Sequence, residues 1–281
     1  MSLSPGNTAW PANAGQAVGS EDIASDAGGV LLSIARLVKR FGAVEALSGV
    51  DLEVPAGQVT ALMGDNGAGK STLIKTVSGI WEPDAGQIRW AGEPVRIRSP
   101  KDASALGIAT VYQDLALCDN LDIVQNMFLG REYTEYRLLD ETKMEREAKA
   151  TLSDLSVTTV RSIRQAVGSL SGGQRQAVAV ARAVMQNARL VIMDEPTAAL
   201  GVAQTAMVLE LIRTLRSRGI AVLLISHNLN DVFAVADRLA VLYLGRIAAA
   251  GPVSEFDTQS AVYAITTGTR RESSAEHSET A

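Results

Sequence analysis

The sequence predicts an α/β fold in which a mostly parallel sheet is covered by helices. Between residues 30 and 268, short apolar runs bounded by turn residues alternate with stretches whose apolar residues recur at helical spacing. A glycine-rich segment lies where one expected strand passes into a helix. Folds of this kind bind ligands at the carboxyl ends of their parallel strands, so functional residues are expected there.

The expected elements follow one another along this folded unit. Strands are predicted over 31–38, 44–54 and 58–63, and a helix runs from Lys70 to Ser78 with Gly79 placed to end it. Further on, the pattern predicts strands over 87–90, 95–97, 108–112, 190–193 and 220–225, and helices over 101–106, 172–186 and 202–218.

Three segments depart from the α/β alternation. Residues 114–168 carry dense charge with apolar residues at helical intervals, which predicts an inserted helical subdomain. Residues 1–29 and 269–281 are polar and offer too little apolar surface to offset the entropy of ordering, so both are expected to be disordered tails.

Composition narrows the class of protein. The 281 residues include 26 basic and 31 acidic side chains, a net charge of −5, which gives no basic footprint for nucleic acid. The single cysteine, Cys118, excludes an intrachain disulfide and favours a reducing compartment. The start of the chain lacks the order of a secretory signal, and no apolar run approaches the roughly 20 residues of a membrane helix.

The stretch from residue 64 to residue 72 matches the phosphate-binding pattern G-x-x-x-x-G-K-[ST]. Its backbone N–H groups and the start of the following helix favour anions. Lys70 is expected to reach the β- and γ-phosphates of a nucleotide, and the Ser71 hydroxyl is a hard oxygen ligand suited to Mg²⁺. The candidate nucleotide-binding residues are Gly64, Asp65, Asn66, Gly67, Ala68, Gly69, Lys70, Ser71 and Thr72.

Two acidic residues follow the apolar strand expected over 190–193. Asp194 is expected to hold Mg²⁺ through water, and Glu195 lies where its carboxylate can act as general base on an attacking water. On its own, such a run is most often a strand that meets a solvated turn. The phosphate-binding stretch upstream favours a nucleoside triphosphatase.

The segment Leu170-Ser171-Gly172-Gly173-Gln174 opens the helix expected over 172–186. A serine hydroxyl, a glycine backbone and a helix start together make a second candidate anion site. The alternative is an ordinary serine-capped helix.

These motifs, in this order, resemble those of the ATP-binding subunit of ABC (ATP-binding cassette) transporters, for which LSGGQ is the signature. The resemblance implies that Phe41 stacks on adenine, that Gln113 contacts Mg²⁺ or the attacking water, and that His227 contacts the γ-phosphate. Without the resemblance, Phe41 also fits core packing and His227 fits a helix cap.

The resemblance also implies a fold and an assembly. The fold is the ABC cassette of the P-loop NTPases, with an N-terminal antiparallel β subdomain and an inserted α-helical subdomain. Two cassettes of this family pack head to tail, so the signature residues of one chain are expected to face the nucleotide held by the other. Those residues are Ser171, Gly172, Gly173 and Gln174. Because the chain has no internal repeat, a homodimer with two competent sites is expected.

Four segments, 64–67, 111–117, 126–132 and 196–200, narrow the resemblance to the monosaccharide importers of the ribose, xylose and fructose type. Many proteins of that branch fuse two cassettes, whereas this chain has one. In addition, Gly201 stands where most ABC ATPases have an aspartate.

The branch implies an ATP-hydrolysing subunit at the cytoplasmic face of the inner membrane, with ATP and Mg²⁺ as cofactors. Its expected partners are separate permease subunits and an extracytoplasmic sugar-binding protein, and no nucleic acid. Two alternatives remain open: the same role for another solute such as an amino acid, and a soluble ABC protein acting on ribosomes or DNA. The lack of a repeat, a sustained heptad pattern or a cysteine cluster argues against the second.

Overall fold

The computed structural model describes residues 29–270, apart from residues 137 and 158. The tails expected over 1–29 and 269–281 therefore lie almost entirely outside the described residues. Within the described part, no helix has both the length and the apolar character needed to cross a membrane.

The N-terminal part of the described chain contains a four-stranded antiparallel sheet. Its strands are β1 (Val30–Phe41), β2 (Val44–Pro55), β4 (Ala85–Trp90) and β5 (Glu93–Val95), in the order β2-β1-β4-β5. The prediction of a strand over 95–97 is wrong because β5 begins earlier in the chain. Ala91 and Gly92 both have positive φ, so they close a two-residue hairpin in which Glu93 already pairs with Trp90.

A six-stranded sheet forms the centre of the molecule, in the order β12-β11-β3-β10-β9-β6. Its strands are β3 (Val59–Met63), β6 (Ile108–Val111), β9 (Leu190–Asp194), β10 (Ala221–Ile225), β11 (Arg238–Tyr243) and β12 (Arg246–Pro252). All neighbours pair in parallel except β12, which runs antiparallel along one edge. The predicted mostly parallel sheet is therefore confirmed.

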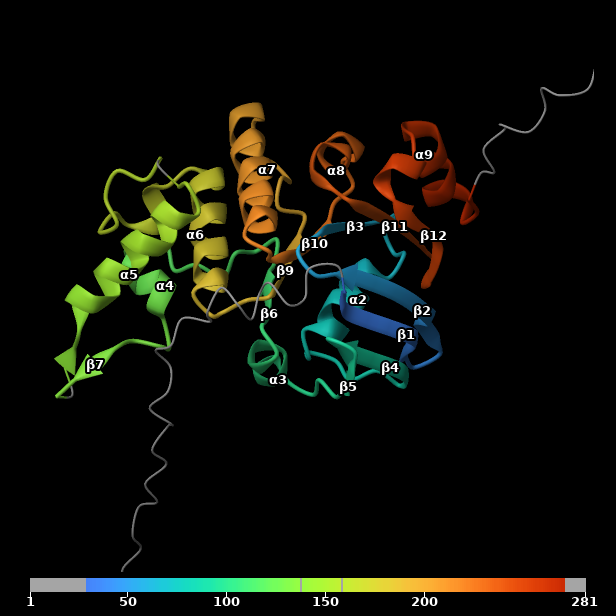
Figure 1. The fold of residues 1–281 in the computed structure, drawn as a ribbon, viewed down its shortest axis with the longest axis horizontal. Coiled ribbons are helices and arrows are strands. Elements are labelled where there is room, and N and C mark those ends of the chain that lie inside the picture. Colours follow the sequence, from blue (N-terminus) through green and yellow to red (C-terminus); the bar gives the residue numbers. More distant parts are fainter. Residues whose placement is uncertain (1–28, 137, 158, 271–281) are drawn as a thin grey trace, which may run out of the picture.

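Side chains of the central strands alternate between two hydrophobic cores. Leu62 and Ile192 face a core shared with the antiparallel sheet, α2 (Lys70–Val77) and α3 (Pro100–Ala105). Met63 and Met193 face the opposite core, which α7 (Val202–Ser217), α8 (Leu229–Val235) and α9 (Thr258–Thr267) cover. Figure 1 shows these three helices on one side of the sheet and the blue antiparallel sheet on the other. Burial on both faces explains why the strands read as continuous apolar runs.

A helical lobe stands beside this layered core (Figure 1). It contains α4 (Ile123–Phe128) and α5 (Glu141–Asp154), and both pack against α6 (Gly172–Val184). Because α6 also contacts β6 and β9, it connects the lobe to the central sheet. A small hairpin, β7 (Thr134–Glu135) with β8 (Leu138–Leu139), also lies in the lobe. The sequence did not predict it, because strands of two residues are too short to show an alternating apolar pattern.

Asn126 fastens the segment that enters the lobe. Its side chain is fully buried on α4, accepts a hydrogen bond of 2.7 Å from the Cys118 N–H, and donates to the carbonyls of Cys118, Leu121 and Asp122. The amide thereby satisfies four backbone groups of the segment between β6 and α4. Each of the three carbonyls also accepts a backbone N–H, whereas the Cys118 N–H depends on the Asn126 side chain.

Replacing Asn126 by alanine is therefore expected to lower the free energy of unfolding by about 1–3 kcal/mol, since the Cys118 N–H loses its partner and three carbonyls each lose one of two donors. Urea denaturation of the purified chain measures the change. The matched control is Asn230→Ala on the exposed surface of α8, which is expected to change stability by less than about 0.5 kcal/mol. An equal loss in both variants would contradict this role of Asn126.

Candidate functional site

The carboxyl ends of four parallel strands meet at one edge of the central sheet. Ile225 at the end of β10 pairs with Leu62 of β3 on one side and with Asp194 of β9 on the other. On the far side of β9, Met193 pairs with Val111 at the end of β6. The segments that follow these strands carry the phosphate-binding stretch, the acidic pair, His227 and Gln113, so the topology gathers motifs that are far apart in the sequence.

The phosphate-binding stretch is a glycine-dependent loop between β3 and α2. Gly64, Gly67 and Gly69 all have φ in the left-handed region, at 155°, 82° and 108°. A Cβ at Gly69 would lie 2.7 Å from the carbonyl oxygen of Ala46, so the position is closed to larger residues. Gly69 is also the N-cap of α2. Because glycine has no side chain to cap the helix, the N–H groups of the first turn can point toward an anion in the loop.

The Lys70 side chain folds back across this loop. Its ammonium group donates hydrogen bonds to the carbonyl oxygens of Gly64, at 2.7 Å, and Asp65, at 3.0 Å. The cation thus lies inside the loop, beside the N-terminus of α2. Loop amides, helix start and ammonium group together suit a polyphosphate.

Asp194 ends β9 and is partly buried. Burial and the neighbouring charge of Glu195 raise the pKa of the Asp194 carboxyl, while the ammonium groups of Lys70 and Lys75 act in the opposite direction. A bound divalent cation would relieve both disfavouring effects. The carboxylate of Asp194 and the hydroxyl of Ser71 are oxygen donors of the kind Mg²⁺ prefers, so the residues present fit this metal.

Glu195 and His227 form a pair. Glu195 Oε2 lies 2.7 Å from His227 Nδ1. The Glu195 side chain is mostly buried, with 16% exposure, whereas that of His227 is 71% exposed. A shielded carboxylate joined to an imidazole that faces outward can accept a proton from a water at the end of the sheet.

Phe41 lies at the end of β1, and the residue is 40% exposed. It packs edge-on against Trp81, with ring centroids 4.7 Å apart, and the Lys75 ammonium group lies over the Trp81 ring. Core packing therefore describes one side of Phe41 only, and an exposed part of the ring remains for stacking. No motif in the sequence singled out Trp81.

The signature residues form a capped helix start within one chain. Ser171 Oγ accepts from the Gln174 N–H, and Gln174 Oε1 accepts from the Ser171 N–H, so the pair forms a capping box at α6. Gly172 and Gly173 back onto the start of α7, where a Cβ on Gly173 would lie 3.3 Å from Gln204 Cβ. Gly201 is the N-cap of α7, without a side-chain cap and with nothing within 4 Å of a built Cβ.

Arg182 on α6 holds the segment that follows Gln113. Its guanidinium donates hydrogen bonds to the carbonyl oxygens of Ala116, at 3.0 Å, and Leu115, at 3.2 Å. Burial lowers the pKa of Arg182, although the group stays charged. The helix that begins with the signature residues is thereby tied to the Gln113 segment. An arginine within the apolar run 177–183 is a local sign of a polar contact, but the sequence does not show with which segment.

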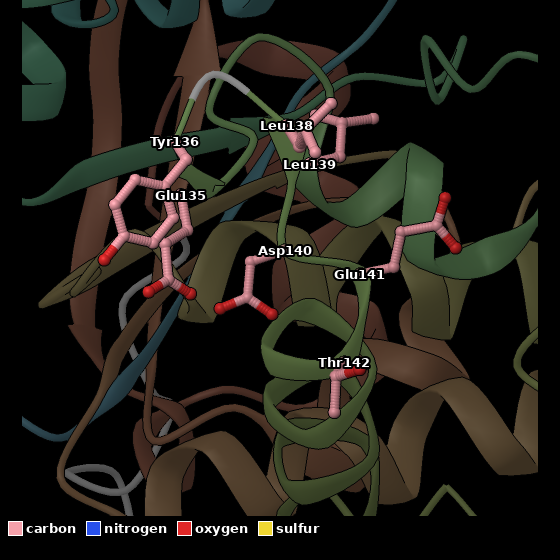
Figure 2. A pocket seen from close by; sticks show the side chains of 7 residues that line it. All are labelled: Glu135, Tyr136, Leu138, Leu139, Asp140, Glu141 and Thr142. Carbon is pink, nitrogen blue, oxygen red and sulfur yellow. The ribbon is translucent and has the colours of Figure 1, made fainter.

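A cavity of about 540 Å³ lies elsewhere, at the β7–β8 hairpin near the tip of the helical lobe (Figures 1 and 2). Figure 2 shows the Glu141 side chain turned away from those of Glu135 and Asp140. Asp140 caps α5 by accepting from the Lys143 N–H, and Glu141 pairs with Arg164 at 2.7 Å. These two carboxylates therefore stabilise the lobe, and the cavity is separate from the sheet edge.

The environment of Asp194 makes a prediction about stability. Because its pKa is raised in the folded chain, the ionised carboxylate weakens folding at every pH above the ordinary range of aspartate, and this effect is lost as the pH falls. Asp194→Asn is expected to raise the Tm of the Mg²⁺-free chain at pH 7.5 by about 2 °C in calorimetry. Glu93→Gln, at an exposed carboxylate, serves as the control and should leave the Tm unchanged. A lower Tm for the Asp194 variant would contradict the account of this site.

Comparison with known proteins agrees with this geometry. The model of the family described as "ABC transporter" matches residues 47–198. The fructose import ATP-binding protein FrcA of Rhizobium meliloti and the xylose/arabinose import ATP-binding protein XylG of Sulfolobus acidocaldarius are each 52% identical to the chain, over 77% of it and 86% of their own length. A crystal structure of an ATP-binding cassette of an ABC transporter in its ADP conformation superposes with a TM-score of 0.73 at 27% identity, covering 85% of this chain and 95% of that one. By family match, identity and fold, the chain belongs to the ABC transporter family.

Proposed function

We propose that the chain is the ATP-hydrolysing subunit of an ABC importer that takes up a monosaccharide. The contact of 2.7 Å between Glu195 and His227 carries the proposal, because it lies at the sheet edge where the phosphate-binding loop begins. A base beside a phosphate-binding loop is the arrangement that nucleotide hydrolysis requires. The names of FrcA and XylG, which are sugar import ATP-binding proteins, support a monosaccharide as the cargo.

In the proposed reaction, the loop from residue 64 to residue 72 binds the phosphates and Phe41 stacks on the base. Lys70 holds the β- and γ-phosphates as a point charge. Mg²⁺ would be held by Ser71, Asp194 and Gln113, and when bound it neutralises charge on the phosphate oxygens. Glu195 accepts a proton from the attacking water, and His227 contacts the γ-phosphate from the exposed side of the pair.

The proposed assembly is a homodimer. Ser171, Gly172, Gly173 and Gln174 of one chain would face the nucleotide of the other, which agrees with their place at a helix start, where the field favours an anion. ATP binding closes such a dimer, and hydrolysis reopens it. Permease subunits would supply the membrane passage and an extracytoplasmic sugar-binding protein the cargo, so the chain would act at the cytoplasmic face of the inner membrane.

Glu195→Gln is expected to retain ATP binding and to lose turnover by about 100-fold or more, because the amide cannot accept the proton of the attacking water. The trapped chain should also dimerise with Mg-ATP, and light scattering should show a shift from about 30 to about 60 kDa, given the chain mass of 29.6 kDa. The matched control is Glu210→Gln on the exposed side of α7, which should hydrolyse ATP at the wild-type rate. Rapid hydrolysis by the Glu195 variant would remove Glu195 as the base.

Lys70→Ala tests the phosphate-binding loop. Loss of one charge-assisted contact to phosphate is expected to weaken ATP binding by roughly 10- to 100-fold, since such a contact contributes about 1.5–3 kcal/mol. Isothermal titration with ATP measures the dissociation constant. Lys101→Ala, at an exposed lysine of α3, is the control. An unchanged dissociation constant in the Lys70 variant would refute the assignment.

A further inference from the structure

Glu195 and His227 lie on two segments that leave neighbouring strands. Glu195 begins the segment after β9, and His227 lies between β10 and α8. The backbone of Glu195 is tied to β10, because its N–H donates to the Ile225 carbonyl at 2.9 Å. Glu195 nevertheless has a φ of 50°, in the left-handed region that residues with a side chain avoid. Such a conformation persists only where the surroundings hold it.

A second bond joins the same two segments farther from the strands. Thr197 Oγ1 donates to Asp231 Oδ2 at 2.7 Å. Asp231 lies in the first turn of α8 and is 7% exposed, so its carboxylate is one of the few buried charged groups in the described chain. A buried carboxylate is costly without hydrogen-bond donors. The Thr197 hydroxyl therefore stabilises Asp231 by pointing its proton at Oδ2.

The two side-chain contacts close a ring. The ring runs from Glu195 to His227, along the chain to Asp231, across to Thr197, and back through the backbone to Glu195. Movement of the Thr197 segment away from α8 would therefore pull the Glu195 carboxylate from the imidazole. Neither Thr197 nor Asp231 has a part in the chemistry described above, so their bond is free to act through position alone.

We propose that the bond between Thr197 and Asp231 is a latch that holds Glu195 against His227, which makes both members of the latch positioning residues. The proposal rests on the proposed function, since it assigns them to ATP hydrolysis. A purely structural role is the competing account: Asp231 would stabilise the N-terminus of α8, and its loss would lower stability without moving the pair.

Kinetics of three variants test the latch. Thr197→Val keeps the shape of the side chain but removes the donor, and kcat is expected to fall about tenfold with KM for ATP within twofold, because a small displacement of a catalytic group is costly. Thr197→Ser keeps a hydroxyl and should restore kcat to within about threefold of wild type. Thr214→Val on α7, which removes a hydroxyl bonded to the Glu210 carbonyl, is the matched control and should match wild type.

A double-mutant cycle and a spectroscopic signal separate positioning from stability. Asp231→Ala alone, and together with Thr197→Val, should lower kcat by the same factor as Thr197→Val alone, because all three break one bond. Because the chain has two histidines, its ¹⁵N NMR spectrum contains few ring signals. A His277→Gln variant removes one set of them and so assigns the other to His227. The Nδ1 signal of His227 should move in Thr197→Val as it does in Glu195→Gln, and should stay in place in Thr214→Val.

Wild-type kcat in Thr197→Val, or a loss of kcat with an unmoved His227 signal, would overturn the latch. Failure of Thr197→Val to bind ATP would indicate that this variant is misfolded. Thr197→Ala, which removes the same donor with a smaller side chain, then replaces it in the kinetic and NMR measurements. A wild-type chain that binds ATP without hydrolysing it would refute the proposed function, whereas the His227 signal would still decide whether the latch holds the pair.

Discussion

The parallel pairing of β3, β10, β9 and β6 is the constraint on which the functional site depends. Because Leu62, Ile225 and Asp194 pair in register, the segments that follow their strands emerge at the same level of the sheet. A slip of one residue in any of these strands would turn its side chains to the wrong core and would also displace a functional residue. The two cores that flank the sheet therefore hold the register, and in doing so they hold the phosphate-binding loop, Glu195 and His227 in reach of one another.

Two residues at this edge are unfavourable for folding alone. Asp194 is partly buried beside the charge of Glu195, and Glu195 itself has a left-handed backbone. Local features that weaken a fold are expected where a site is prepared for charged ligands. The compensation lies in ordinary packing, since the strands that carry these residues are almost fully buried on both faces.

The sequence was sufficient for the features that rest on local chemistry or strong periodicity. The strands around the phosphate-binding stretch, the helix after Gly69 and the mostly parallel sheet were predicted because apolar period and glycine placement agree there. Contacts set by tertiary structure were not predicted. The bond of Thr197 to Asp231 joins residues from two loops, the carbonyl contacts of Arg182 join α6 to a distant segment, and Asn126 showed no local sign that its amide would be buried. Each of these depends on which elements pack together, which the pattern of one segment does not contain.

The start of α6 explains how a group can serve its own chain and still suit a partner. The Ser171 hydroxyl caps α6 through one lone pair, and the helix start keeps its favourable field for an anion from outside. Gly201 at the N-cap of α7 has little effect on the stability of that helix, because glycine there costs only a few tenths of a kcal/mol relative to aspartate. The space around it would also admit a larger residue. In the proposed homodimer both interfaces would carry this glycine, so position 201 could act between the chains only through its backbone.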